Sequence, residues 1–64
     1  MNSTFIEALA HCNKEKDLNS KNFLEYILSK YFCEERLFMS MKDAIPYLDK
    51  GDLEVFIPIV YSIE

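Results

Sequence analysis

The chain has 64 residues, of which 50% are hydrophobic, 14% aromatic and 28% charged, with one glycine and two prolines. This composition predicts a single small folded domain over residues 1–64, because a disordered chain would carry fewer apolar side chains. Eleven acids against seven bases give a net charge of −4. An acidic surface repels phosphates, so we expect no direct binding of nucleic acid.

The chain also lacks the marks of export and of membrane insertion. Two cysteines are too few for the disulfide framework of a small secreted domain. The first residues have neither the basic start nor the unbroken apolar stretch of a signal peptide. No apolar run approaches the roughly 20 residues that a membrane helix needs. We therefore expect a cytoplasmic protein without a membrane partner.

The first helix is expected over residues 4–15. Thr4 and Glu7 have the spacing of a capping box, in which the threonine hydroxyl and the glutamate carboxylate bind each other's backbone N–H. The helix then places Phe5, Ile6, Leu9 and Cys12 along one apolar stripe, which indicates an amphipathic helix.

A second helix is expected to begin near Lys21, with Asn19 or Ser20 as its cap. If Asn19 is the cap, Leu18 and Phe23 are placed to form a hydrophobic staple. Apolar residues recur at spacings of three and four, which defines the buried face. They are Phe23, Leu24, Ile27, Leu28, Tyr31 and Phe32.

The stretch after Cys33 allows two interpretations. The residues EERLFM could continue the second helix, or RLFMSM could form a short strand. Ser40 and Asp43 each offer a cap for a short helix over AIPYL, and Gly51 is expected to end that helix in the left-handed conformation.

The last segment, DLEVFIPIVYSIE, is consistent with either a strand or a helix. Its alternating β-branched residues favour a strand, in which Pro58 would lie at a sheet edge. A helix capped by Asp52 would place Pro58 in its second turn. The only partner strand would be RLFMSM, and an isolated two-stranded sheet is marginal in water. We therefore expect an all-α fold, a compact bundle of three or four short helices, with an α+β fold carrying a C-terminal strand as the alternative.

One segment resembles a known repeat. The twelve residues AIPYLDKGDLEV are similar to the inter-helix turn of HEAT-type helical repeats, although Phe56 stands where a basic residue usually follows the valine. The resemblance implies helix–turn–helix geometry across these residues.

The residue types that carry catalysis or bind metals are sparse. His11 and Cys12 are adjacent, and neighbours on a helix point about 100° apart, so they cannot form a catalytic dyad. Cys12 and Cys33 lack the spacing of a zinc site, and one glycine excludes a phosphate-binding loop. We expect no enzyme activity, no cofactor and no metal.

The charge is uneven along the chain and predicts a binding surface. Residues 1–42 hold six acids and six bases, whereas residues 43–64 hold five acids against Lys50 alone and carry the whole excess. We expect a small regulatory or inhibitory protein that binds the basic surface of a larger protein. The expected contact residues are Asp43, Asp49, Asp52 and Glu54, together with Tyr47.

Residues 53–63 are apolar on every helical face, and also on both faces if they form a strand. Such a segment must be covered on all sides. We expect a homodimer with Phe56, Ile59, Val60 and Ile63 near its centre, which would also suit a structural small subunit of a larger assembly. The alternative is that the first two helices cover this segment in the core of a monomer.

Overall fold

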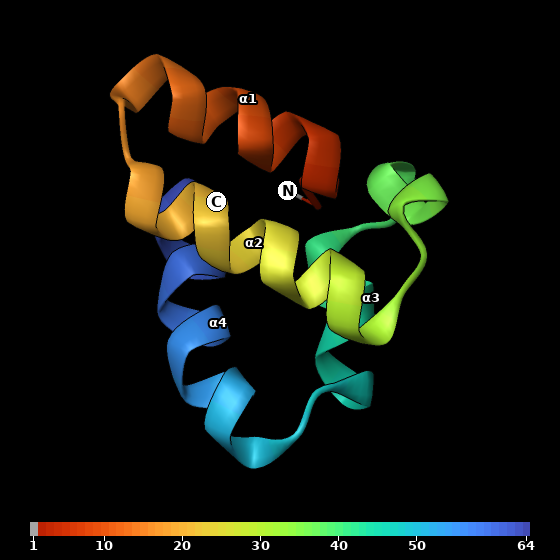
Figure 1. Ribbon diagram of the computed structural model, residues 1–64. Coiled ribbons are helices and arrows are strands. Elements are labelled where there is room, and N and C mark those ends of the chain that lie inside the picture. Colours follow the sequence, from red (N-terminus) through yellow and green to blue (C-terminus); the bar gives the residue numbers. More distant parts are fainter. Residues whose placement is uncertain (1) are drawn as a thin grey trace.

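The computed structural model describes residues 2–64, and helices account for most of them (Figure 1). The α-helices are α1 (Phe5–Glu15), α2 (Leu18–Tyr31), α3 (Met41–Ala44) and α4 (Lys50–Ile63), and two short 3₁₀ helices are η1 (Glu34–Phe38) and η2 (Ile45–Tyr47). In residues 2–64 the only β-type pairing is an isolated antiparallel bridge between Thr4 and Ser40. The expected all-α bundle is confirmed, and the α+β alternative is excluded.

The first helix forms as its sequence predicts. The Thr4 hydroxyl accepts a hydrogen bond from the Glu7 backbone N–H at 3.2 Å, and the Glu7 carboxylate accepts one from the Thr4 N–H at 2.9 Å. The helix ends at Glu15, and Lys16, which follows it, adopts the left-handed conformation with φ of 59°. The tight turn that follows brings α2 back antiparallel to α1 (Figure 1).

The helix α2 begins earlier in the sequence than predicted. Asp17 is the cap, and its carboxylate accepts hydrogen bonds from the backbone N–H and the hydroxyl of Ser20 at 3.1 and 2.7 Å. The helix therefore begins at Leu18, before both Asn19 and Lys21. Since Leu18 already lies in the first turn and is 63% exposed, it does not form the expected staple with Phe23.

The segment after α2 is neither a helical extension nor a strand. The helix ends at Tyr31, the next two residues are extended, and η1 forms a single irregular turn. Ser40 then precedes α3, which passes directly into η2. The segment that resembles a HEAT-type turn thus folds as short helical pieces, an extended link and α4.

The start of α4 also differs from the expectation. Asp49 is its cap and accepts a hydrogen bond from the Asp52 N–H at 3.0 Å, so the helix begins three residues before the place that a cap at Asp52 would give. Gly51 lies in the first turn of α4 without a positive φ, and it does not end the preceding segment. Pro58 falls in the third turn instead of the second, on the exposed side of the helix.

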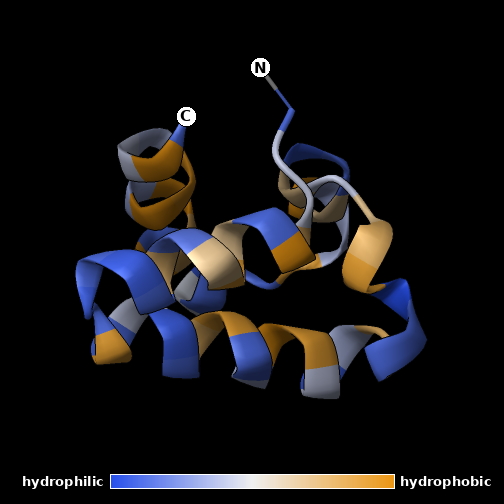
Figure 2. Ribbon diagram, turned by 90° about the horizontal axis from the view of Figure 1, so that it is seen from above, coloured by the Kyte–Doolittle hydropathy of each residue, from blue (hydrophilic) through white to orange (hydrophobic). Residues whose placement is uncertain are grey.

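The core lies where α1, α2 and α4 meet. Phe5 stacks on Phe56 with ring centroids 6.0 Å apart, and it packs at an angle against Phe32 with centroids 6.3 Å apart. Figure 2 shows that the hydrophobic parts of the helices face the middle of the molecule. The buried residues are Phe5, Ala8, Cys12, Leu24, Ile27, Leu28, Met41, Ala44, Leu48, Phe56 and Val60.

A short extended segment before α1 joins distant parts of the chain. The Phe5 N–H donates to the carbonyl of Met39 at 3.1 Å, and the Met41 N–H donates to the carbonyl of Ser3 at 2.9 Å. The Ser3 N–H donates to the carboxylate of Glu64 at 2.9 Å. This segment therefore holds the connection before α3 and the end of α4 together.

Candidate functional site

The side chains best suited to catalysis or to metal binding are poorly placed for either function. Cys12 is buried in the core, and burial raises the pKa of its thiol, with a further contribution from the nearby Asp17 carboxylate. A thiol of this kind is a weak nucleophile, because the thiolate is the reactive form. His11 is exposed on the same helix. In the part of the chain that the structure describes, no three His, Cys, Asp or Glu side chains are grouped so that they could hold a metal ion.

Within residues 2–64, no helix combines the length and the apolar character needed to cross a membrane.

Two of the acids expected to bind a partner are already engaged within the chain. Lys30, on α2, lies 2.9 Å from the Asp52 carboxylate and 3.3 Å from the Asp49 carboxylate. The Tyr31 hydroxyl donates to Asp52 at 2.5 Å and accepts from the Asp49 N–H at 3.1 Å, and the Tyr26 hydroxyl also donates to Asp52. These contacts fasten the start of α4 to the second half of α2.

The hydrogen bonds of this cluster shift the pKa values of its members. The Asp52 pKa is lowered, first by the Tyr31 hydroxyl and then by the Lys30 ammonium. The Asp49 pKa is lowered mainly by the Asp52 N–H, and the Lys30 pKa is raised mainly by Asp52. The Tyr31 pKa is raised by burial and by the neighbouring Asp52 carboxylate. All three charged side chains therefore stay ionised near neutral pH.

This cluster alters the expected acidic surface. The side chain of Asp52 is only 14% exposed, and Lys30 offsets much of its charge. Asp43 on α3 and Glu54 on α4 are exposed, and neither side chain makes an ion pair or hydrogen bond with a described residue. Tyr47 is exposed too, with its ring edge-on to Phe32. The predicted set is therefore divided between acids that are paired with Lys30 at the surface and separate outward-facing side chains.

The residues expected at the centre of a homodimer also need correction. Phe56 and Val60 are completely buried within the single chain, where a second chain cannot reach them. Ile59 and Ile63 are partly buried and pack against the same core. The alternative, in which the first two helices cover this segment, describes Phe56 and Val60 correctly. The packing explains why, because α2 lies against α4 and Phe5 of α1 stacks on Phe56.

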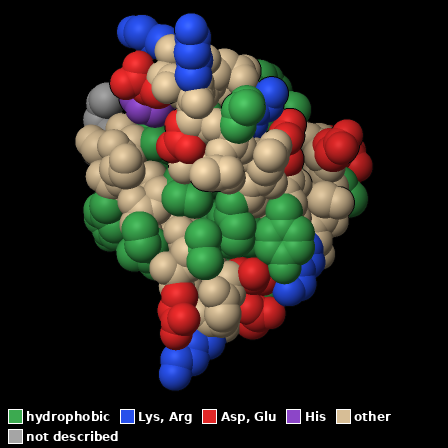
Figure 3. All heavy atoms as spheres, turned by 60° about the vertical axis from the view of Figure 1, so that its left-hand side comes forward, with side chains coloured by type: hydrophobic (Ala, Val, Ile, Leu, Met, Phe, Trp, Pro, Cys, Tyr) green, Lys and Arg blue, Asp and Glu red, His purple; other side chains and the backbone are tan. Residues whose placement is uncertain are grey.

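Two large apolar residues of α4 remain accessible, and one of them, Val55, lies on its flank toward α2. Val55 is 47% exposed, and it lies one turn after Asp52, which bonds to Tyr26 on α2. Tyr26 is 43% exposed and packs against Phe23, with ring centroids 5.6 Å apart. Figure 3 shows hydrophobic side chains gathered across the middle of this side of the molecule, with charged side chains above and below them. We call the surface formed by Phe23, Tyr26, Val55 and Ile59 the α2–α4 face.

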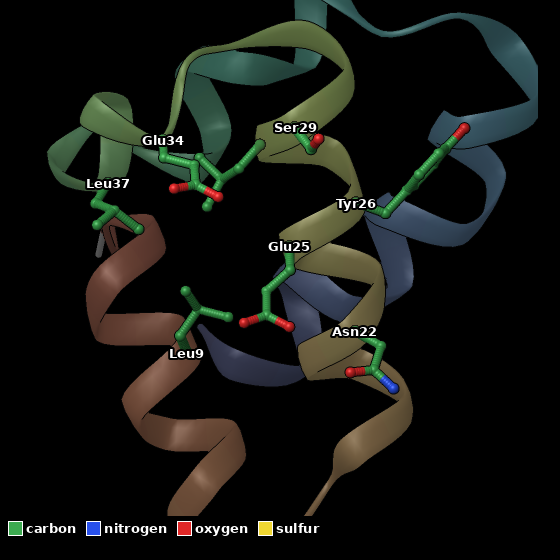
Figure 4. Close-up of a pocket in the computed structure, with 8 residues that line it drawn as sticks. Leu9, Asn22, Glu25, Tyr26, Ser29, Glu34 and Leu37 are labelled. Atoms are coloured by element: carbon green, nitrogen blue, oxygen red, sulfur yellow. The ribbon is translucent and has the colours of Figure 1, made fainter.

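A groove lies on another side of α2, where α1, α2 and η1 come together (Figure 4). It encloses about 660 Å³ and is open to solvent. Leu28 forms its buried floor, and Leu9 and Leu37, both partly buried, form apolar walls. The complete lining is Leu9, Asn22, Glu25, Tyr26, Leu28, Ser29, Glu34 and Leu37.

Two carboxylates give this groove its charge. Glu25 on α2 and Glu34 on η1 both extend toward the space between α1 and α2, which Leu9 and Leu37 face as well (Figure 4). Both glutamates are exposed, and neither makes a hydrogen bond or an ion pair with a described residue. The groove thus combines apolar walls with negative charge that the chain does not neutralise.

The sequence did not indicate this groove. Glu25 and Ser29 lie one turn apart on the polar side of α2, and Glu34 follows the end of that helix, so each has the pattern of a solvated surface residue. The only local signal is that Asn22, Glu25 and Ser29 recur at helical spacing on one flank. Their proximity to Leu9 and Leu37 depends on where η1 folds back toward α1.

No protein-family model matches this chain, and no curated protein or solved structure matches it significantly.

Proposed function

We propose that this protein acts by binding the basic surface of a larger protein, as a small regulatory or inhibitory protein without catalytic activity of its own. The observation that carries the proposal is a set of outward-facing carboxylates that no base of the described chain neutralises. Glu25, Glu34, Asp43 and Glu54 belong to this set. They contribute to the net charge of −4 and are exposed, so a partner can meet them.

Charge of this kind acts mainly on the rate and specificity of association. Opposite potentials steer two proteins together, and salt screens the attraction over a distance of about 8–10 Å. The exposed aromatic side chains Phe38, Tyr47 and Tyr61 add contact area of a type that is enriched in interfaces. A partner rich in arginine or lysine at its contact surface fits both features.

The experiment compares two double charge reversals in an affinity capture followed by cross-linking and mass spectrometry. Glu25→Lys with Glu34→Lys changes the groove, and Asp43→Lys with Glu54→Lys changes α3 and α4. Each pair raises the formal net charge from −4 to 0, so they differ in position and not in total charge.

We expect the wild-type chain to capture a partner through lysine-rich or arginine-rich contacts, with a yield that falls as salt rises. One of the two variants should lose this partner, while the other loses only the general electrostatic contribution. Capture that is insensitive to salt and to both reversals would refute the proposal.

A second candidate function is self-association, as a homodimer or as a structural subunit. The α2–α4 face favours it, because Tyr26 and Val55 are exposed next to the partly buried Phe23 and Ile59. Sedimentation equilibrium at micromolar concentration tests it, with Val55→Glu as the disruptive variant and Tyr61→Glu, on the other flank of α4, as the control. The function is supported if the wild-type chain is a dimer that Val55→Glu dissociates and Tyr61→Glu does not. It is rejected if the wild-type chain is a monomer at all concentrations.

A further inference from the structure

The groove between α1, α2 and η1 is suited to one kind of segment from a partner. We propose that it receives a short stretch of the partner protein in which an arginine or lysine side chain, flanked by apolar residues, lies between the carboxylates of Glu25 and Glu34. This inference rests on the proposed function and specifies where the partner binds and what chemistry it presents.

The length of the groove fits a short segment. Asn22 and Ser29 are seven residues apart on α2, which corresponds to about 10 Å along a helix with a rise of 1.5 Å per residue. Glu34 and Leu37 on η1 continue the lining beyond the end of α2. About three residues of an extended chain, or two turns of a helix, span that distance.

The apolar walls suit the stem of a long basic side chain. Leu9 and Leu37 face the space from α1 and η1, and the buried Leu28 also lines it. Arginine and lysine place their methylene groups along apolar surfaces while the charged head reaches polar groups. A carboxylate or a phosphate group would instead meet two glutamates and be repelled.

The carboxylates suit the head of the same side chain. Glu25 and Glu34 have no ionic partner in the described chain, so a cation that enters between them replaces no existing ion pair. Hydrogen bonds from a guanidinium to a carboxylate are short and are about twice as strong as neutral ones. By contrast, Asp49 and Asp52 already hold Lys30, which makes that cluster a poorer place for an external base.

The test uses two blocked pentapeptides with leucine on both sides of the central residue, one with arginine and one with citrulline, its neutral analogue. Each is titrated into the isotopically labelled protein and followed by backbone NMR spectra. We expect the arginine peptide to shift the amide signals of Leu9, Glu25, Glu34 and Leu37, and to bind at least about tenfold more tightly than the citrulline peptide.

Matched variants separate the groove from general charge. Glu25→Gln with Glu34→Gln should lower the affinity for the arginine peptide to that for the citrulline peptide. Asp43→Asn with Glu54→Gln changes the net charge equally and should leave the preference for the arginine peptide intact. The spectrum of each variant also shows whether it remains folded.

The inference is overturned if the two peptides bind equally, or if neither shifts the groove signals. If the arginine peptide shifts signals only on α3 and α4, the groove is rejected while the proposed function stands. If basic peptides bind nowhere and the capture experiment finds no salt-sensitive partner, both are rejected.

Discussion

Substitutions at two valines of α4 test the packing of the chain. The two residues are of the same type and lie on the same helix, but they differ in burial. Val60 is completely buried, whereas Val55 is 47% exposed. Replacing Val60 by alanine removes two buried methyl groups, at about 0.8 kcal/mol each, and leaves a small cavity that raises the cost to about 2–3 kcal/mol. At Val55 the lost burial is smaller and no closed cavity forms. Alanine also favours a helix by roughly 0.5 kcal/mol at both positions, and this gain cancels in the comparison.

The assay is urea unfolding followed by circular dichroism, at two protein concentrations. Val60→Ala should be less stable than Val55→Ala by about 2 kcal/mol, or roughly 8–16 °C in Tm for a domain of this size. A chain of this length has a total stability of about 3–10 kcal/mol, so a loss of this size is a large fraction of the total and is readily measured. The loss should not depend on protein concentration, because Val60 packs within one chain. Equal losses at the two valines, or a loss at Val60 that disappears at high concentration, would refute the assignment of Val60 to the core of a monomer.

Three further predictions concern local contacts. Because hydrogen bonds lower its folded pKa, Asp52 should stabilise the fold above the unfolded pKa near 4, and this contribution should fade as the pH drops below that value. Unfolding midpoints measured from about pH 6 to pH 2 should show a weaker acid dependence for Asp52→Asn than for the wild-type chain, and an equal dependence in the two proteins would contradict this role of Asp52. Thr4→Ala should cost about 1 kcal/mol in urea unfolding, because it removes the capping box of α1; an unchanged midpoint would contradict that role. In the native protein an aromatic disulfide reagent should modify Cys33 quickly and reach Cys12 only on unfolding, and the reverse order would contradict the burial of Cys12.

The parts of the fold that the sequence predicts correctly depend on interactions between residues that are close together in the sequence. The capping box of Thr4 and Glu7 needs only four residues in order, and the apolar stripe of α2 needs only helical spacing. The prediction fails where adjacent residues compete. Asp17, Asn19 and Ser20 can all cap a helix, and Asp17 does so while Ser20 serves as its donor.

The features that the sequence does not reveal depend on contacts between distant residues. Lys30 and Asp52 are separated by 22 positions, and their ion pair converts part of an expected binding surface into a link between helices. Residues 53–63 carry apolar side chains on every side of the helix. Their pattern therefore indicates that the segment is covered, but it does not indicate which side this chain itself covers. The groove is hidden for the same reason, since Leu9 and Glu34 meet only after η1 has folded against α1.

The extended segment before α1 determines how the molecule should open. The amides of Phe5 and Met41 bond across to residues more than 30 positions away, and the Ser3 amide bonds to a side chain 61 positions away. The two backbone bonds join the residues at and just before the start of α1 to the segment before α3, so the fraying of the last turns of α2 or α4 breaks neither of them. The protons of Phe5 and Met41 should therefore exchange with solvent at the rate of global unfolding, while those in the last turns of α2 exchange earlier through local opening. Hydrogen exchange at these two amides would thus report the cooperativity of the whole chain.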